Sequence, residues 1–280
     1  MNEQYYSPQR FSILPTVVKN LLIINALFFL ATLAFNNFLG IDLYKYLSLY
    51  FYKSENFHLY QYITYMFMHS TGNFGHILFN MFALWMFGST IENQWGSKKF
   101  LFYYLLTGIG AGITHTAVMA IDYYSIASVI NLYAENPTVD TFFALISNEF
   151  KGVYNPEFLN EFIRNWRISP YDRSFVSQSM EIAESLLAAK ANVPTVGASG
   201  SVYGLLLAFG MMFPNALIYV YFLFPLKAKW FVIIFGAAEL YLGIRGTNDG
   251  VAHFAHLGGM IFGLILILMW KKRNRNYYQY

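Results

Sequence analysis

Gly197-Ala198-Ser199-Gly200 stands at the head of an apolar stretch in the last third of the chain. A second apolar stretch, of membrane length, carries Ala255-His256-Leu257-Gly258-Gly259. A hydroxyl and an imidazole are the two groups that nucleophilic acyl transfer needs. An ionisable side chain inside a membrane costs about 3 kcal/mol or more, so such a group indicates a functional site. Ser199 and His256 are therefore the first candidates for chemistry in this chain.

The composition is that of a membrane protein. Of 280 residues, 56% are hydrophobic, 20% are aromatic and 12% are charged, whereas a soluble domain carries about 25% charged residues. The chain has no cysteine, which excludes disulfides and a thiolate nucleophile or metal ligand. It shows no phosphate-binding loop, no zinc-ligand spacing and no basic patch interleaved with aromatics, so neither a cofactor, a metal nor a nucleic-acid partner is expected.

Six apolar segments predict membrane spans, because a helix needs about 20 apolar residues to cross the hydrocarbon core. The fourth and fifth are short, and 216–226 between them is expected to form a re-entrant or interfacial hairpin. The sequence thus predicts an all-α membrane protein with six transmembrane helices. The predicted spans are 17–35, 74–91, 100–121, 199–213, 230–244 and 251–270.

Basic residues predict the orientation of these spans. With six spans the termini share one side with the loops after spans two and four, and lysine and arginine gather there, which makes that side cytoplasmic. Residues 122–194 then lie outside, with nine acids against five bases. We expect a cytoplasmic N-terminus (1–15), a membrane domain (16–270) that contains the extracytoplasmic insertion (122–194) between helices 3 and 4, and a basic cytoplasmic tail (271–280).

The insertion shows apolar residues at helical spacing in two places. Residues 158–166 and 175–189 predict short amphipathic helices that pack on each other or on the membrane surface. A structured spacer and a binding domain both remain open as its role.

Polar residues from three spans converge near the outer ends of their helices. Ser199 opens span four, and His256 lies about a turn and a half into span six. His76 and Asn80 are four residues apart at the start of span two, so they share a helical face. The chemistry of these groups suits three roles. Ser199 suits a nucleophile and His256 a general base, and donors to an oxyanion could come from His76, Asn80 and the Ser199 amide.

The neighbours of this pair have supporting roles. Tyr203, one turn after Ser199, is placed to pack against the His256 ring. No acid is expected beside His256, so the site is predicted to be a dyad, and Asp249 is the nearest outer acid. His69 and His253 are expected to line the site or to form hydrogen bonds.

Glycines at four-residue spacing explain how the two spans could approach. Gly200 and Gly204 lie on span four, and Gly259 and Gly263 lie on span six. Small residues at this spacing let membrane helices pack closely. Such patterns are also common in membrane helices that have no catalytic role, and a lone intramembrane histidine can serve as a proton relay in a transporter. The chain shows no repeated halves of the kind that transporters carry.

Taken together, the chain resembles the rhomboid family of intramembrane serine proteases. The matching residues are His76 and Asn80 in span two, Glu92 with Gly96-Ser97 after it, Gly197-Ala198-Ser199-Gly200 with Tyr203 in span four, and Ala255-His256 with Gly259 and Gly263 in span six. The resemblance implies a six-helix bundle without metal or cofactor that cleaves transmembrane protein substrates near the outer face. It assigns Ser199 and His256 as the catalytic dyad and His76, Asn80 and the Ser199 amide as the oxyanion site, with Tyr203, Gly197, Gly200, Gly259 and Gly263 in support.

The chain departs from the family pattern at Tyr60-Gln61, where rhomboids often carry Trp-Arg, and in the long insertion before Ser199. The alternative function is a rhomboid-like membrane protein that binds or chaperones partners without cleaving them. The lack of a transit-type leader favours a bacterial plasma membrane, and the lipid bilayer and transmembrane substrates are the expected partners.

Overall fold

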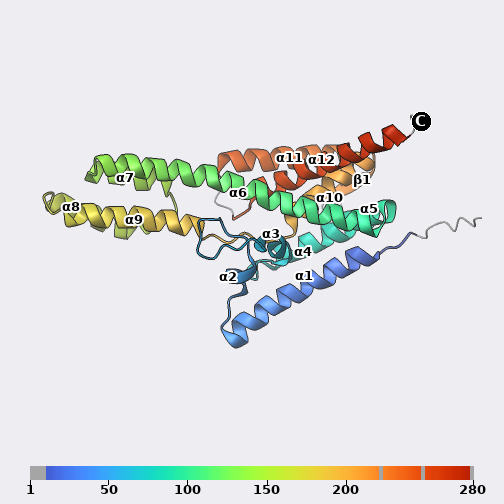
Figure 1. Ribbon diagram of the computed structural model, residues 1–280, viewed down its shortest axis with the longest axis horizontal. Coiled ribbons are helices and arrows are strands. Elements are labelled where there is room, and N and C mark those ends of the chain that lie inside the picture. Colours follow the sequence, from blue (N-terminus) through green and yellow to red (C-terminus); the bar gives the residue numbers. More distant parts are fainter. Residues whose placement is uncertain (1–10, 221–222, 247–249, 278–280) are drawn as a thin grey trace, which may run out of the picture. The chain divides into compact units, whose positions relative to one another are not determined.

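Helices make up most of this protein. The computed structural model describes residues 11–220, 223–246 and 250–277, with side chains up to 272 (Figure 1). The described helices are α1 (Thr16–Ala34), α2 (Leu43–Leu47), α3 (Gln61–Thr64), α4 (Phe74–Ala83), α5 (Ser89–Trp95), α6 (Ser97–Glu135), α7 (Val139–Glu149), α8 (Pro156–Ile168), α9 (Ser174–Ala191), α10 (Ser199–Met212), α11 (Ala228–Arg245) and α12 (His253–Tyr277). Short π or 3-10 turns are η1 (Phe35–Leu39), η2 (Tyr65–Phe67) and η3 (Leu84–Gly88).

Four of the described helical segments are long and apolar enough to cross a membrane. They are Thr16–Leu39, Phe74–Trp95, Ser97–Glu135 and His253–Lys272. The shorter α10 is also apolar, and α11 is apolar apart from Lys229, Glu239 and Arg245. Every predicted span falls on a helix.

The helix of span three extends beyond the predicted end of the span at 121, because α6 continues to Glu135. The continuation has a physical reason. Ile126, Ile130 and Tyr133 are spaced at helical intervals and are buried in a hydrophobic cluster.

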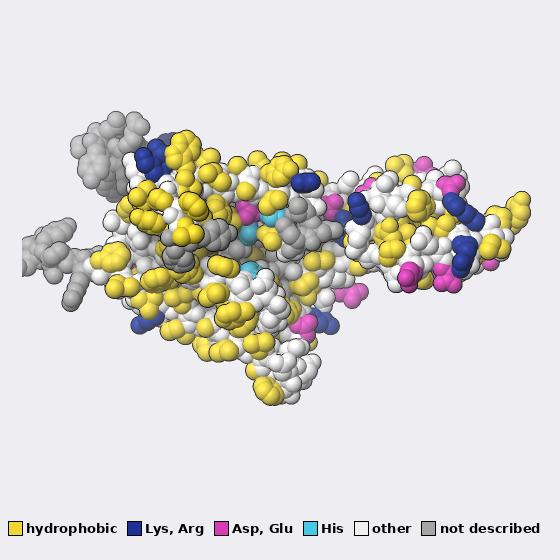
Figure 2. Space-filling view, turned by 180° about the vertical axis from the view of Figure 1, so that it is seen from behind, with side chains coloured by type: hydrophobic (Ala, Val, Ile, Leu, Met, Phe, Trp, Pro, Cys, Tyr) yellow, Lys and Arg dark blue, Asp and Glu magenta, His cyan; other side chains and the backbone are white. Residues whose placement is uncertain are grey.

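The chain divides into two compact units. The first holds residues up to Leu49, Leu59–His115 and residues from Thr195 onward, and the second holds Tyr50–His58 and Thr116–Pro194. Figure 2 shows hydrophobic side chains over most of the unit with the membrane-length helices, while charged side chains concentrate on the other unit.

Helix α10 is the centre of the first unit. It packs against α11 and α12, and these two helices also pack against each other (Figure 1). Its buried positions cover most of its circumference: Gly200, Ser201, Val202, Gly204, Leu205, Leu206, Ala208 and Gly210. A helix that is buried almost all round must lie inside a bundle, and small residues let its neighbours come close.

The buried carboxylate of Glu92 ties α1 to the end of α5. It accepts hydrogen bonds from the backbone N–H groups of Val17 (3.0 Å) and Val18 (2.8 Å) and from the hydroxyl of Ser97 (2.6 Å). The first N–H groups of a helix have no partner within the helix and carry partial positive charge, so an anion satisfies them well.

A β-hairpin connects α10 and α11, where the sequence predicted a re-entrant or interfacial hairpin. β1 (Leu217–Val220) pairs antiparallel with β2 (Phe224–Lys227), with Leu217 opposite Lys227. Leu217 and Phe224 are exposed, as expected for a hairpin at an apolar boundary.

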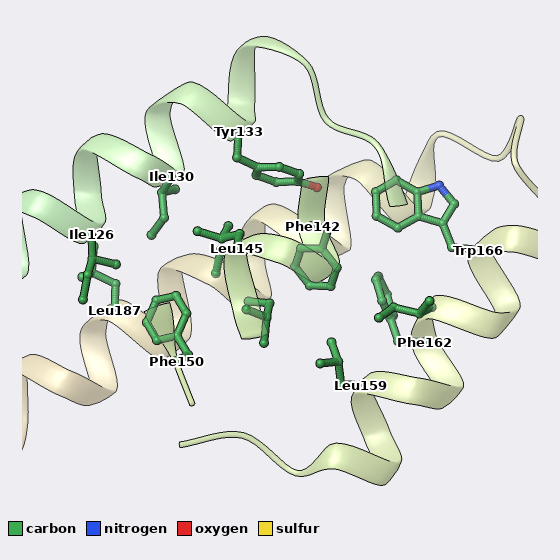
Figure 3. Packing of buried hydrophobic residues seen from close by; sticks show 13 residues of the cluster. Ile126, Ile130, Tyr133, Phe142, Leu145, Phe150, Leu159, Phe162, Trp166 and Leu187 are labelled. Atoms are coloured by element: carbon green, nitrogen blue, oxygen red, sulfur yellow. The ribbon is translucent and has the colours of Figure 1, made fainter. Parts of the chain in front are cut away.

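The second unit is helical and has its own core (Figure 3). The helices predicted at 158–166 and 175–189 are present as α8 and α9. Helix α7 was not predicted. The core combines residues from these three helices and from the last part of α6: Ile126, Ile130, Tyr133, Phe142, Leu145, Ile146, Phe150, Leu159, Phe162, Ile163, Trp166, Ala183 and Leu187.

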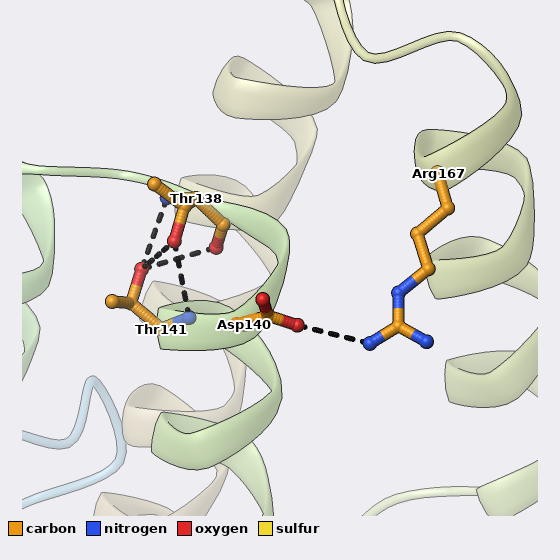
Figure 4. A network of polar contacts seen from close by, with 4 residues as sticks. All are labelled: Thr138, Asp140, Thr141 and Arg167. Atoms are coloured by element: carbon orange, nitrogen blue, oxygen red, sulfur yellow. Dashed lines mark hydrogen bonds and ion pairs between the residues drawn. The ribbon is translucent and has the colours of Figure 1, made fainter.

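Polar contacts at the start of α7 set its boundary (Figure 4). Thr138 and Thr141 form a reciprocal capping box, in which each hydroxyl accepts from the other residue's backbone N–H. Asp140 and Arg167 form an ion pair of 2.9 Å, but both side chains are largely exposed. Exposed pairs stabilise by only about 0–1 kcal/mol, so the apolar core, and not this pair, holds the second unit together.

We predict that Phe142→Ala destabilises the second unit by about 3–5 kcal/mol, because Phe142 is fully buried and its removal leaves a cavity. Amide hydrogen exchange of the full-length protein should speed up across α7, α8 and α9. Phe143→Ala is the matched control, because Phe143 is 45% exposed. Equal protection in the two variants would contradict this account of the core.

Candidate active site

Ser199 and His256 are in hydrogen-bond contact. The hydroxyl Oγ of Ser199 lies 2.8 Å from Nε2 of His256. Ser199 is the first residue of α10 and is half-buried, and His256 lies in the first turn of α12 and is 8% exposed. Gly197, just before α10, has φ of 129°, which side chains rarely adopt, so this turn into the helix requires glycine.

The close approach of α10 and α12 brings the pair together. A Cβ atom on Gly259 would overlap the backbone carbonyl of Gly200, so the two helix backbones touch at this point. The other two glycines do not face each other. Gly204 packs against Thr107, and Gly263 packs against the Tyr103 hydroxyl, both on α6. The Gly200–Gly259 contact therefore joins spans four and six. Gly204 and Gly263 instead leave room for side chains of α6 to pack against these two helices.

Tyr203 lies flat against the imidazole of His256. The ring centroids are 4.2 Å apart and the planes are within 6° of parallel. The Tyr203 hydroxyl donates a hydrogen bond to Oε1 of Glu239. Tyr203 thus contacts both the imidazole and a carboxylate beside it.

The expectation that no acid lies beside His256 is wrong. Glu239, buried in α11, places Oε2 2.9 Å from Nδ1 of His256 and 2.7 Å from Nδ1 of His253. The contact with His253 has hydrogen-bond geometry, whereas Oε2 lies at ion-pair distance from His256 but off the line of its N–H. Asp249, the nearest outer acid in the sequence, lies outside the described residues.

Glu239 had a signal in the sequence. It is the single acid in the apolar segment 228–245, and an ionisable residue in such a segment indicates function by default. The pairing of α11 with α12, which carries Glu239 to His256, could not be read from either segment alone.

His76 approaches Ser199 across Gly197. A Cβ atom on Gly197 would lie 2.9 Å from Nε2 of His76 and 3.5 Å from Oγ of Ser199, so both polar atoms border the same small space. The backbone N–H of Ser70 donates to Nδ1 of His76 at 3.3 Å. A neutral imidazole that accepts at Nδ1 carries its proton on Nε2. Nε2 of His76 is therefore a donor on the Ser199 side.

Asn80 is buried on α4, one turn after His76. Its Nδ2 donates to the backbone carbonyl of His76 at 2.8 Å. An amide nitrogen has two hydrogens, and this bond uses one of them. His69 is also buried, and its ring centroid lies 5.2 Å from that of His76.

Glu239, His253 and His256 are also of the types that bind zinc. Their ligand atoms lie within 4.8 Å of one another, and two histidines with one carboxylate form a known catalytic zinc set. Each has a partner within the protein, however. The carboxylate oxygens contact Tyr203 and His253, and Nε2 of His256 contacts Ser199. Hydrogen bonds hold this cluster together, except at Nδ1 of His256, which lies only at ion-pair distance from Glu239.

This network combines a hydroxyl, an imidazole and a carboxylate in the order that acyl transfer uses, with a donor from His76 nearby. On the face seen in Figure 2, histidine and acidic side chains reach the surface among hydrophobic ones.

Comparison with known proteins identifies the family of this chain. The family model for the Rhomboid domain matches residues 56–129 and 175–273, which include Ser199, His256, His76 and Asn80. An uncharacterized mitochondrial rhomboid protein of Schizosaccharomyces pombe is 30% identical over 225 residues, which cover 72% of this chain and 50% of the relative. The chain thus spans about half the length of the curated relative that it matches. It belongs to the rhomboid family and is a multi-pass membrane protein.

We predict that Gly259→Ala separates α10 from α12, since the added methyl group meets a backbone carbonyl that cannot rotate away. Overpacking of this kind costs about 1–3 kcal/mol, which should lower the thermal unfolding midpoint in detergent. Gly236→Ala is the control, because its methyl group would meet only the flexible end of Met260 at 3.2 Å. An unchanged midpoint in Gly259→Ala would contradict the helix contact.

Proposed function

We propose that this protein is an intramembrane serine endopeptidase that cleaves transmembrane protein substrates, with Ser199 as nucleophile and His256 as general base. The observation that carries the proposal is the 2.8 Å contact between Ser199 Oγ and His256 Nε2 within an apolar helical bundle. Membership of the rhomboid family supports the same reaction class. A non-catalytic binder has no need of this contact.

The reaction follows from the geometry. Nε2 of His256 takes the hydroxyl proton as Ser199 Oγ attacks the scissile carbonyl carbon, and the carbonyl oxygen becomes an oxyanion. Nε2–H of His76 and the backbone N–H of Ser199, at the open start of α10, are placed to donate to it, and Asn80 is the third candidate. The protonated His256 then gives its proton to the leaving amine. Water resolves the acyl ester by the same steps in reverse.

The proposal includes a topology of six spans, with both termini in the cytoplasm and residues 122–194 on the outer side with the active site. The charge asymmetry of the loops supports it. A substrate helix would enter past α11. We propose a bacterial plasma membrane as the host. The Schizosaccharomyces pombe relative carries the word mitochondrial in its name, so cell fractionation is the deciding measurement.

Ser199→Ala should abolish cleavage of a single-span reporter co-reconstituted in vesicles, and it should abolish labelling by a serine-reactive phosphonate, because both need Oγ. Ser201→Ala is the matched control. Ser201 follows Ser199 by two residues on the same helix and is buried. Its hydroxyl donates a hydrogen bond to the backbone carbonyl of Tyr104 at 2.8 Å. Equal cleavage by wild type and Ser199→Ala would refute the proposed nucleophile, and absence of both cleavage and labelling in wild type would refute the protease.

The topology can be tested because the chain has no cysteine. Lys151→Cys and Lys98→Cys each place one exposed thiol on opposite sides of the proposed membrane. A membrane-impermeant maleimide added to intact cells should label Lys151→Cys and should label Lys98→Cys only after permeabilisation. The reverse pattern would invert the proposed orientation.

A further inference from the structure

We infer that Glu239 is a positioning residue of the catalytic centre, so that this protease works with a Ser199–His256–Glu239 triad and not with a dyad. The inference rests on the proposed function and deepens it. Its starting point is the carboxylate oxygen Oε2, which lies 2.9 Å from Nδ1 of His256, the ring nitrogen opposite the one that contacts Ser199.

The two oxygens of Glu239 have different partners. Oε1 accepts from the Tyr203 hydroxyl, while Oε2 lies between Nδ1 of His253 and Nδ1 of His256. A carboxylate that is buried in an apolar helix is costly unless it is paired and hydrogen-bonded. These three groups come from α10 and α12, so the bundle surrounds Glu239 with partners that include the catalytic base.

The position of Glu239 sets the protonation pattern that the reaction needs. Nε2 of His256 can accept the Ser199 proton only if the ring proton is on Nδ1. A carboxylate beside Nδ1 favours that tautomer, and it stabilises the imidazolium that forms when Ser199 attacks. Oε2 now lies off the N–H line, and such contacts often become aligned only when substrate binds.

Tyr203 links the two parts of this arrangement. Its ring stacks on the imidazole, and its hydroxyl holds the carboxylate. One side chain of α10 therefore fixes both the plane of His256 and the place of Glu239. The competing explanation is that Glu239 only joins α11 to α12 through His253, which predicts an effect on stability and none on chemistry.

The test compares wild type with Glu239→Gln in vesicles that contain the single-span reporter. Glutamine keeps the shape and removes the charge. We expect kcat to fall by about 100-fold or more, since the loss of the acid from a Ser-His-Asp triad costs up to about 10⁴-fold. KM should stay within about twofold, and the phosphonate should label Ser199 more slowly in proportion to kcat. Glu239→Asp should recover part of the loss, and Tyr203→Phe, which keeps the ring, should show a smaller loss than Glu239→Gln.

Glu92→Gln is the matched control, because Glu92 is also a buried carboxylate of the same unit but binds backbone N–H groups of α1. It should lower the thermal midpoint and leave the labelling rate of the folded fraction unchanged. A Glu239→Gln variant that behaves like Glu92→Gln, or that keeps kcat within threefold of wild type, would overturn the inference and leave the protease intact.

Three further outcomes are informative. Loss of wild-type activity in EDTA, with recovery on adding zinc, would overturn the triad and assign Glu239, His253 and His256 to a metal site. Full activity in EDTA supports the triad. Wild type that neither cleaves nor labels would overturn the proposed function itself, and this inference with it.

Discussion

The rest of the first unit depends on the contact between the α-carbon of Gly259 and the backbone carbonyl of Gly200. At this point α10 and α12 have no side chain between them, so the groups that flank the contact are forced together. Ser199 precedes Gly200 and His256 is one turn before Gly259, and their side chains meet at 2.8 Å. A single methyl group on Gly259 would therefore act directly on the distance between Ser199 and His256, whereas one on Gly200 would meet Ala111 of α6.

Burial of charge is the second constraint. Among its described residues, the first unit buries two carboxylates, and each is surrounded by donors. Glu92 receives two backbone N–H groups and a hydroxyl at the start of α1. Glu239 contacts a tyrosine hydroxyl and two imidazoles. The need to pair a buried carboxylate therefore has two different results. Backbone donors at Glu92 anchor a helix, whereas the imidazole partners of Glu239 connect this acid to the candidate active site.

The second unit follows simpler rules. Its helices carry apolar residues at helical spacing and meet in one aromatic-rich core, and the surface ion pair of Asp140 and Arg167 adds little. The family match leaves out residues 130–174, which lie in this unit. Its core is independent of the residues that form the candidate active site.

The sequence by itself determined the helical class and the places of the apolar helices, and it indicated Ser199, His256, His76 and Asn80 as the candidate residues, because hydropathy and residue spacing are local properties. It could not determine which helices touch. The end of α6 and the existence of α7 depend on burial against partners distant in sequence. Whether a glycine packs against a helix backbone, as Gly259 does, or against a side chain of α6, as Gly204 and Gly263 do, depends on which neighbour it faces. Only the tertiary structure brought Glu239 of α11 to His256 of α12, because a contact between two helices depends on their rotation and depth, and neither is encoded in one segment alone.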